Sequence, residues 1–148
     1  MKKLALYFSV LLMTATFSCK QDRTENPQYT VVGTWQPYKI VETTVANGVS
    51  DSQVYNFSTC EKDSRWTFTA DYKGSQLTKS DASGTCDIIK SENITYTLDT
   101  NNAISITHQN GDVDYGRVTS ATDTKMNIVL ETNTGNVYHS LTYSFNRK

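Results

Sequence analysis

Hydrophobic and polar residues alternate one by one along most of the chain after residue 30. In the segment ENITYTLDT, Ile94, Tyr96 and Leu98 share one face, and polar residues occupy the other face. Such alternation is typical of strands that bury one face in a core and expose the other to water. The many Thr, Tyr, Val and Ile residues in these segments also favour strands.

Further segments repeat the same alternation. The positions predicted to point inward are Trp66 and Phe68; Ile104, Ile106 and His108; Tyr115; Met126, Ile128 and Leu130; and Val137, His139, Leu141, Tyr143, Phe145 and Arg147. Residues 49–59 lack the alternation and are predicted to be an irregular connection, and Pro37 is predicted to interrupt the first strand.

Short turn signals separate the strand segments. They lie at Asn47-Gly48, Asp71 to Gly74, Asp99 to Asn102, Asn110-Gly111, Thr122 to Thr124 and Asn133 to Asn136. Because several of these connections are so short, neighbouring strands must form antiparallel hairpins. We therefore predict an all-β fold, an antiparallel up-and-down meander of about eight strands that closes into a small barrel and so hides its edges.

The N-terminal region has a different composition. Lys2 and Lys3 precede a mostly apolar run, Leu4 to Phe17, that is too short for a membrane-spanning helix of about 20 residues and is typical of a signal peptide. Residues 1–18 are therefore predicted to be a signal peptide. The next residues contain no aliphatic side chain, so 19–30 is predicted to be a polar tether and 31–148 a single folded domain.

Cys19 lies at the junction between the signal peptide and the tether. The segment that ends there resembles a bacterial lipobox, which implies cleavage before Cys19, a diacylglycerol on its thiol and an acylated amino terminus. Two or more acyl chains anchor a protein stably to a membrane. Lys20 resembles the residue after the cysteine in outer-membrane lipoproteins, so the resemblance implies a lipid-anchored protein in a Gram-negative cell envelope. Ordinary cleavage that leaves a free or intermolecular Cys19 is the alternative.

The other two cysteines, Cys60 and Cys86, are predicted to form a disulfide, as is common in exported proteins. A hairpin centred in the turn at residues 71–74 would place them opposite each other at its open end.

The start of the domain, VVGTWQPYKI, carries a Gly-x-Trp motif at the head of the first strand. With CEKDSRWTFTADYKG, Cys86 and the final YSFNRK, it resembles the lipocalin superfamily, and specifically the small lipocalin-like domains of Gram-negative lipoproteins. In lipocalins the tryptophan closes one end of the barrel and an arginine of the last strand lies across its ring. The resemblance implies these roles for Trp35 and Arg147, with a cation–π contact of about 1–2 kcal/mol when desolvated. The alternative is an Arg147 that frays into solvent.

Catalytic and cofactor motifs are absent from the sequence. It has no Gly-x-Ser-x-Gly elbow, no glycine-rich phosphate loop and no His-Glu-x-x-His, so we predict a protein that is not an enzyme and needs no cofactor. His108 and His139 lack further ligands at metal-site spacing, so no metal site is predicted. No basic cluster favours nucleic acid, and the formal net charge is -1. The protein is expected to be a monomer.

Six residues predicted to point inward combine aromatic and polar groups: Trp66, Tyr96, His108, Tyr115, His139 and Tyr143. Each polar group would cost roughly 1–3 kcal/mol if it were buried without a partner. We therefore predict that they line a modest cavity, open opposite Trp35, that binds a small apolar or amphipathic molecule, as the resemblance to lipocalins implies. The alternative is a solid core whose surface contacts another envelope protein or inhibits an enzyme.

Overall fold

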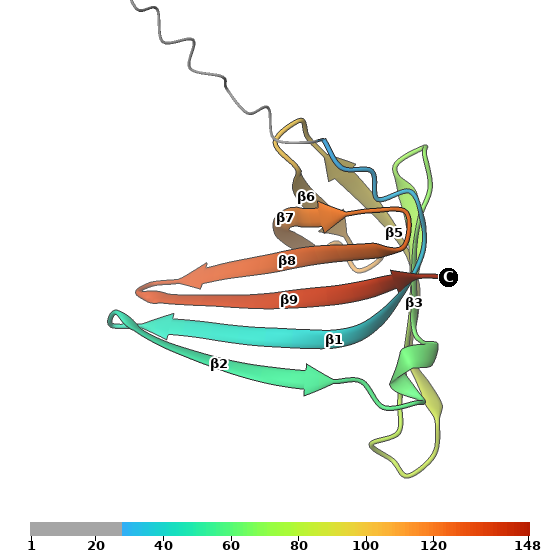
Figure 1. The fold of residues 1–148 in the computed structure, drawn as a ribbon, viewed down its shortest axis with the longest axis horizontal. Coiled ribbons are helices and arrows are strands. Elements are labelled where there is room, and N and C mark those ends of the chain that lie inside the picture. The colour runs from blue at the N-terminus through green and yellow to red at the C-terminus, as the bar shows by residue number, and fades with distance from the viewer. Residues whose placement is uncertain (1–27) are drawn as a thin grey trace, which may run out of the picture.

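The computed structural model describes residues 28–148, and it is built almost entirely of β-strands. The predicted signal peptide, Cys19 and most of the predicted tether lie outside the described residues. The elements are β1 (Gly33–Ala46), β2 (Val49–Asn56), the short 3-10 helix η1 (Glu61–Asp63), β3 (Arg65–Phe68), β4 (Lys73–Ser80), β5 (Asp87–Leu98), β6 (Ala103–Thr107), β7 (Val113–Ala121), β8 (Lys125–Thr134) and β9 (Val137–Arg147) (Figure 1). Among residues 28–148, no helix is long and apolar enough to cross a membrane.

The predicted closed barrel is confirmed. From β3 to β9 every strand pairs with the next one along the chain, and β1 joins the two ends by pairing with both β3 and β9. All of these pairs are antiparallel. The closed circuit therefore has eight strands, and β2 is an additional strand beside it.

Residues 49–56 are not irregular, as the sequence suggested, but form β2. This strand pairs in register with residues 39–46 of β1 through the Asn47-Gly48 turn, in which both residues have positive φ. Positive φ at both positions is the mark of a type I′ turn, which matches the twist of the strands on either side. The backbone ladder and this turn make β2 a strand although all its side chains are exposed.

Pro37 does not interrupt β1 either, because the strand continues through it to Ala46. The register with β9 shifts between Pro37 and Lys39, so Tyr38 forms a bulge. A bulge reverses the alternation of faces. The inner face of β1 is therefore formed by odd-numbered residues such as Trp35 and Pro37 before the bulge, and by even-numbered residues such as Ile40 after it.

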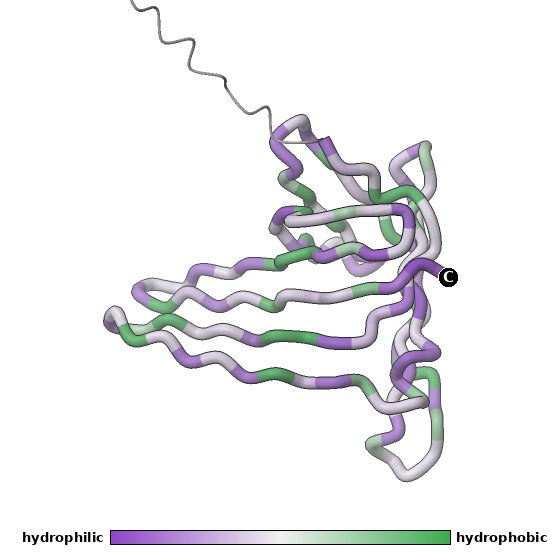
Figure 2. Tube along the Cα trace, viewed as in Figure 1, coloured by the Kyte–Doolittle hydropathy of each residue, from purple (hydrophilic) through white to green (hydrophobic). Residues whose placement is uncertain are grey.

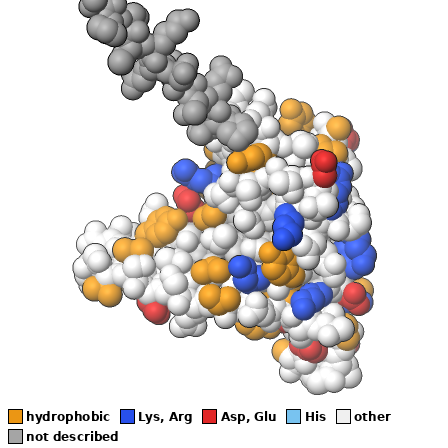
Figure 3. Space-filling model, viewed as in Figure 1, with side chains coloured by type: hydrophobic (Ala, Val, Ile, Leu, Met, Phe, Trp, Pro, Cys, Tyr) orange, Lys and Arg blue, Asp and Glu red, His pale blue; other side chains and the backbone are white. Residues whose placement is uncertain are grey.

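Long strands extend well beyond the rest of the barrel on one side (Figure 1). We call this extension the arm: residues 39–56 of the β1–β2 hairpin with 127–134 of β8 and 137–144 of β9. Figure 2 shows hydrophobic and hydrophilic residues alternating along these strands. On the face in Figure 3, hydrophobic side chains lie over the arm, and most Lys and Arg side chains gather at the opposite end of the molecule.

The core fills the barrel at the end away from the tip of the arm. Its buried hydrophobic residues are Val31, Trp35, Trp66, Phe68, Ile94, Tyr96, Ile104, Ile106, Val118, Met126, Ile128, Leu130 and Phe145. Most of these are positions that the alternation predicted to point inward. Tyr29 also packs against this core, and its backbone N–H donates to Asn102 Oδ1 at 2.8 Å.

The predicted disulfide is confirmed, with the Cα atoms of Cys60 and Cys86 5.5 Å apart. The register of the β3–β4 hairpin differs from the one that would place the two cysteines directly opposite each other, because Trp66 pairs with Gln76. Cys60 precedes η1 and Cys86 precedes β5, so neither cysteine belongs to the β3–β4 ladder. The bond joins the two segments that flank the hairpin.

Candidate functional site

Trp35 and Arg147 close one end of the barrel. Trp35 is 1% exposed, and its indole Nε1 donates to the Val31 carbonyl at 2.7 Å. Arg147 faces Trp35 directly in the β1–β9 ladder, and its guanidinium carbon lies 5.4 Å from the centre of the indole ring. The guanidinium also donates to the Val32 carbonyl at 3.3 Å. The cation–π pair that the lipocalin resemblance implied is therefore present, and Arg147 is not frayed away from the barrel.

A row of polar side chains crosses the inner wall at the other end of the core. Trp66 of β3 lies opposite Gln76 of β4, and Gln76 lies opposite Glu92 of β5. With the Gln76 amide oriented to satisfy both neighbours, Trp66 Nε1 donates to its oxygen at 3.2 Å and its nitrogen donates to Glu92 Oε1 at 3.2 Å. The buried indole is thus connected to a carboxylate by a polar side chain that is itself buried.

His108 continues this row between two carboxylates. Its Nδ1 lies 2.6 Å from Glu92 Oε1, and its Nε2 lies 2.8 Å from Asp114 Oδ2. Lys90 Nζ forms an ion pair with the same Glu92 oxygen at 2.8 Å. The imidazole is 8% exposed, so both carboxylates act on a largely buried ring.

These contacts set the protonation of the row. Burial alone would lower the pKa of His108, but the hydrogen bonds to Asp114 and Glu92 outweigh burial and raise that pKa above 6.5. Burial alone would raise the pKa of Glu92, but the hydrogen bonds from Lys90 and His108 lower it overall. Both nitrogens of an imidazolium can donate, whereas a neutral imidazole donates from only one. The protonated ring therefore satisfies both carboxylates at once.

Beyond this row, the barrel opens into a cavity of about 350 Å³. The cavity is lined by Val113, Asp114, Tyr115, Leu130, Glu131, Thr132, Asn133, His139, Leu141 and Tyr143. Leu130 and Leu141 face each other across the β8–β9 ladder, and Tyr143 is the next inward residue along β9. The Tyr143 ring packs 5.1 Å from Trp66, at the boundary between cavity and core. The wall thus combines apolar side chains with carboxylate, imidazole and phenol groups.

The Tyr143 ring packs against the rings of Trp66 and Phe145. Its hydroxyl has no hydrogen-bond partner among the described residues. Burial raises the pKa of Tyr143, and the nearby Asp114 carboxylate raises it further. The phenol therefore keeps its proton at neutral pH and is a hydrogen-bond donor at the inner end of the cavity.

The six residues predicted to line the cavity do not form one lining. Tyr143 and His139 do line it, and His139 Nε2 donates to Glu42 Oε1 of β1 at 2.8 Å. His108 belongs to the polar row beside it. Trp66 and Tyr96 are packed in the core, where the Tyr96 hydroxyl donates to the Thr69 carbonyl at 2.8 Å.

Tyr115 is the clear error, because it does not point into the barrel. It lies opposite Ser105 and Glu131 and is 64% exposed, so it contributes only to the outer rim of the cavity. In β7 the inward positions are Asp114, Gly116 and Val118. Gly116 is required there, because a Cβ atom at this position would lie 1.9 Å from the Val129 carbonyl oxygen.

The prediction missed Gln76, Glu92 and Asp114, although two of them carry a signal in the sequence. Glu92 is in phase with Ile94 and Tyr96 along β5, and Asp114 is in phase with the buried Val118 along β7. A charged residue in phase with a buried apolar face needs a partner. That rule would have pointed to both carboxylates, and His108 is the partner they share.

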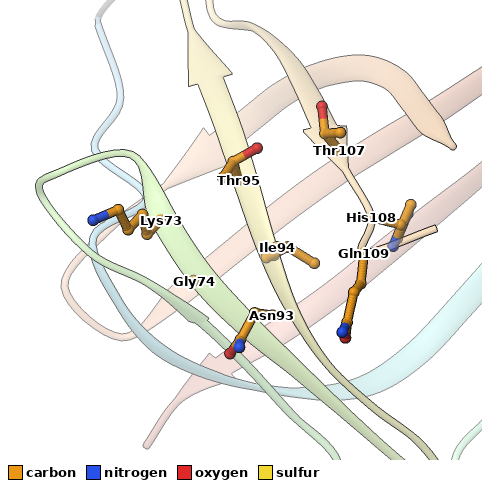
Figure 4. A pocket seen from close by; sticks show the side chains of 8 residues that line it. All are labelled: Lys73, Gly74, Asn93, Ile94, Thr95, Thr107, His108 and Gln109. Atoms are coloured by element: carbon orange, nitrogen blue, oxygen red, sulfur yellow. The ribbon is translucent and has the colours of Figure 1, made fainter. Parts of the chain in front are cut away.

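A second hollow, of about 430 Å³, lies along the outer side of β5 beside the end of β6 (Figure 4). Its lining residues are Lys73, Gly74, Asn93, Ile94, Thr95, Thr107, His108 and Gln109. Asn93 and Thr95 are exposed, and the side chain of Ile94 is already packed in the core. Ile94 is the aliphatic residue of this lining and is only 3% exposed, whereas Leu130, Leu141 and Tyr143 line the inner cavity beside Asp114, so we take the inner cavity as the candidate site. Within residues 28–148, no group of His, Cys, Asp and Glu is arranged to hold a metal ion.

Comparison with known proteins places this arrangement in a family. A family model described as a lipocalin-like domain matches residues 31–128. The chain belongs to the lipocalin-like family. Members of this family typically bind small hydrophobic ligands and are generally binding or transport proteins. No curated protein sequence matches this lipocalin-like chain.

Two solved crustacyanin structures show the same fold at low sequence identity. Lobster apocrustacyanin A1 is 13% identical with a TM-score of 0.52, over 79% of this chain and 60% of that one. Apocrustacyanin C2 is also 13% identical over the same shares, with a TM-score of 0.50. A triple mutant of a bovine odorant-binding protein is 12% identical with a TM-score of 0.45, over 78% of this chain and 72% of that one. The lipocalin-like chain thus matches only about 60% of the length of the crustacyanins.

Proposed function

We propose that this lipocalin-like protein binds a small amphipathic molecule in the open half of its barrel, which is the half beyond the row formed by Gln76, Glu92 and His108 that contains the inner cavity. The observation that carries the proposal is the cavity of about 350 Å³ beyond the packed core. Its volume lies near the lower end of the roughly 300–1,000 Å³ range of small-molecule pockets, so a small ligand is expected. An apolar part would lie against Leu130 and Leu141, and a polar part would reach Asp114 and Tyr143.

The packed half of the barrel limits where the ligand can lie. The ring of Phe68 packs against the rings of both Trp66 and Tyr96, and all three side chains are buried in the core between the cavity and Trp35. Binding in the open half therefore needs no rearrangement of the core. The proposed role is binding alone, without catalysis and without a cofactor.

A substitution that fills the cavity tests this function. Leu141→Trp places a larger side chain in the cavity, whereas Thr142→Trp adds the same side chain to the outer face of β9. We expect the neutral fluorescent probe N-phenyl-1-naphthylamine to bind the wild-type protein and Thr142→Trp equally, and to lose binding to Leu141→Trp. Equal binding to all three proteins would show that the probe lies elsewhere and would contradict the proposal.

The cellular location is a second part of the proposal. We infer that Cys19 is lipidated and that the protein is anchored, as a monomer, in the outer membrane of a Gram-negative envelope. The support is the sequence around Cys19 alone. Membrane fractionation and the mass of the mature protein test it: Cys19→Ala is expected to leave the membrane fraction and to lose the mass of the acyl chains. An unchanged distribution and mass would contradict lipidation.

A protein-interaction role is the second candidate function, and the edge of β2 favours it. Among the described residues β2 pairs only with β1, and it carries no Lys, Pro or bulge of the kind that protects exposed edges. An extended segment of a partner could pair with this edge. A photoreactive residue at position 52, compared with one at position 123, tests this in intact envelopes: a cross-linked partner specific to position 52 is expected.

A further inference from the structure

We propose that the ligand is a cationic amphiphile, with a positively charged head such as an ammonium group at Asp114 and Tyr143 and an alkyl or aromatic tail against Leu130 and Leu141. This inference rests on the proposed binding function and adds the charge of the ligand to it. It also makes the opposite class, fatty-acid-like anions, the poorest ligands for this cavity.

The charges on the inner wall of the open half carry the argument. Among the described residues, three carboxylates lie on the inner wall around this space, Glu42 beside His139, Glu92 behind His108 and Asp114 in the cavity wall, and a fourth, Glu131, lies at the rim. Lys90 is the nearby lysine, and its ammonium is 2.8 Å from Glu92 and outside the cavity lining. No Lys or Arg is among the cavity-lining residues of the described chain. Arg117 lies outside, where it pairs with the rim residue Glu131 at 3.7 Å.

The two histidines do not reverse this balance. With both imidazoles neutral, the three carboxylates outnumber Lys90, and protonation of His108 and His139 only offsets the remaining negative charge. As long as the three carboxylates are ionised, the inner wall therefore carries no net positive charge. An anionic head group would lose its water shell without gaining a cationic partner, which is unfavourable, whereas a cationic head would gain one.

Asp114 is positioned to receive such a head group. One of its oxygens is held by His108 Nε2 at 2.8 Å, which fixes the orientation of the carboxylate. Its other oxygen forms no hydrogen bond or ion pair with the described residues, and the side chain is 47% exposed at the cavity. A carboxylate that is already oriented binds a cation with little loss of its own conformational freedom.

The Tyr143 ring provides a second attraction for a cation. It lines the cavity together with Asp114, and its other side is covered by the core rings of Trp66 and Phe145. A cation within about 6 Å of such a ring is attracted by roughly 0.5–2 kcal/mol, and quaternary ammonium groups are well suited to this contact. A carboxylate and an aromatic face in the same small cavity thus favour the same head group.

Calorimetric titration of the full-length protein with three amphiphiles of one chain length tests the inference. Decyltrimethylammonium, decanol and decanoate share the alkyl tail and differ in head-group charge. We expect the ammonium compound to bind most tightly, decanol next and decanoate most weakly. In Asp114→Asn, the ammonium compound should bind roughly tenfold more weakly, a change of about 1.4 kcal/mol, and decanol should bind as before. Unchanged decanol binding also shows that the variant is folded.

Asp123→Asn is the matched control, because this carboxylate lies in the turn beside Thr124, whose carbonyl accepts the Arg147 backbone N–H at the closed end. It should leave all three affinities unchanged. If decanoate binds as tightly as the ammonium compound, or if Asp114→Asn leaves the ammonium affinity unchanged, the charge preference is wrong while the binding function stands. If none of the three compounds binds, both the inference and the proposed function are wrong.

Discussion

Arg147 lies across the ring of Trp35, directly opposite it in the β1–β9 ladder, with its guanidinium carbon 5.4 Å from the ring centre. The contact joins the first and last strands of the barrel at the end where the core is fully packed. Because the two residues come from opposite ends of the domain sequence, the pair closes the circuit of strands as well as the end of the barrel.

Removal of this contact should destabilise the barrel. Arg147→Ala is expected to lower the free energy of unfolding by about 1 kcal/mol, since the guanidinium is partly exposed and loses both its contact with the Trp35 ring and its hydrogen bond to Val32. Urea unfolding followed by fluorescence measures the change. Lys148→Ala, which removes the neighbouring charge, should have little effect. Equal midpoints for the two variants would show that Arg147 does not stabilise the closed end.

The disulfide should contribute more. Cys60 and Cys86 are separated by 26 positions, and a loop of this size corresponds to roughly 3–4 kcal/mol of stabilisation in the chain-entropy model. The double variant Cys60→Ser, Cys86→Ser should therefore unfold at a clearly lower urea concentration than the wild-type protein. A reductant should lower the wild-type midpoint by a similar amount and leave the variant unchanged. A wild-type midpoint insensitive to reductant would contradict this prediction.

Stability should depend on pH through His108. Burial lowers the pKa of His108, but the hydrogen bonds to Asp114 and Glu92 raise it by more than burial lowers it. The pKa in the folded state is therefore above the unfolded value of about 6.5. A raised pKa means that the folded state binds the proton more tightly. The stabilisation is therefore fully present below about pH 6.5 and is lost as the pH rises through the folded pKa. The urea midpoint should fall over this window in the wild-type protein.

Two variants separate this effect from other titrations. His108→Gln should remove the fall of the midpoint in that window. His139→Gln leaves His108 as the single histidine, because the sequence has two. Its ring resonances can then be titrated by NMR without ambiguity, and the pKa should be above 6.5. A value below 6.5 would mean that burial outweighs the two carboxylates.

Most of the barrel could be predicted because its strands bury one face, and a buried face leaves an alternating pattern. The strand β2 could not be found in this way, since both of its faces are exposed and only the backbone ladder with β1 holds it. Tyr115 was misplaced for a related reason. The outward residues Val113 and Tyr115 are apolar and alternate with their neighbours as clearly as inward residues do in other strands. The inward residues of β7 include Gly116, which has no side chain to indicate the face on which it lies.

The candidate site was harder to predict than the fold. Single-strand alternation identified His108, His139 and Tyr143 as inward residues, but it carries no information about which strands bring their partners. The Glu92–His108–Asp114 contact joins three segments whose register depends on the turns between them. The position of the cavity also depends on where the core rings end, which is a property of packing in three dimensions.

The compound that the cavity holds in the cell can be identified directly. The wild-type protein, Leu141→Trp and Thr142→Trp would be purified without denaturant from the cells that produce them, and organic extracts would be compared by mass spectrometry. We expect a small amphipathic compound that is present with the wild-type protein and Thr142→Trp and depleted with Leu141→Trp. Extracts that show no such compound, or the same compounds in equal amounts from all three proteins, would contradict the proposed binding function.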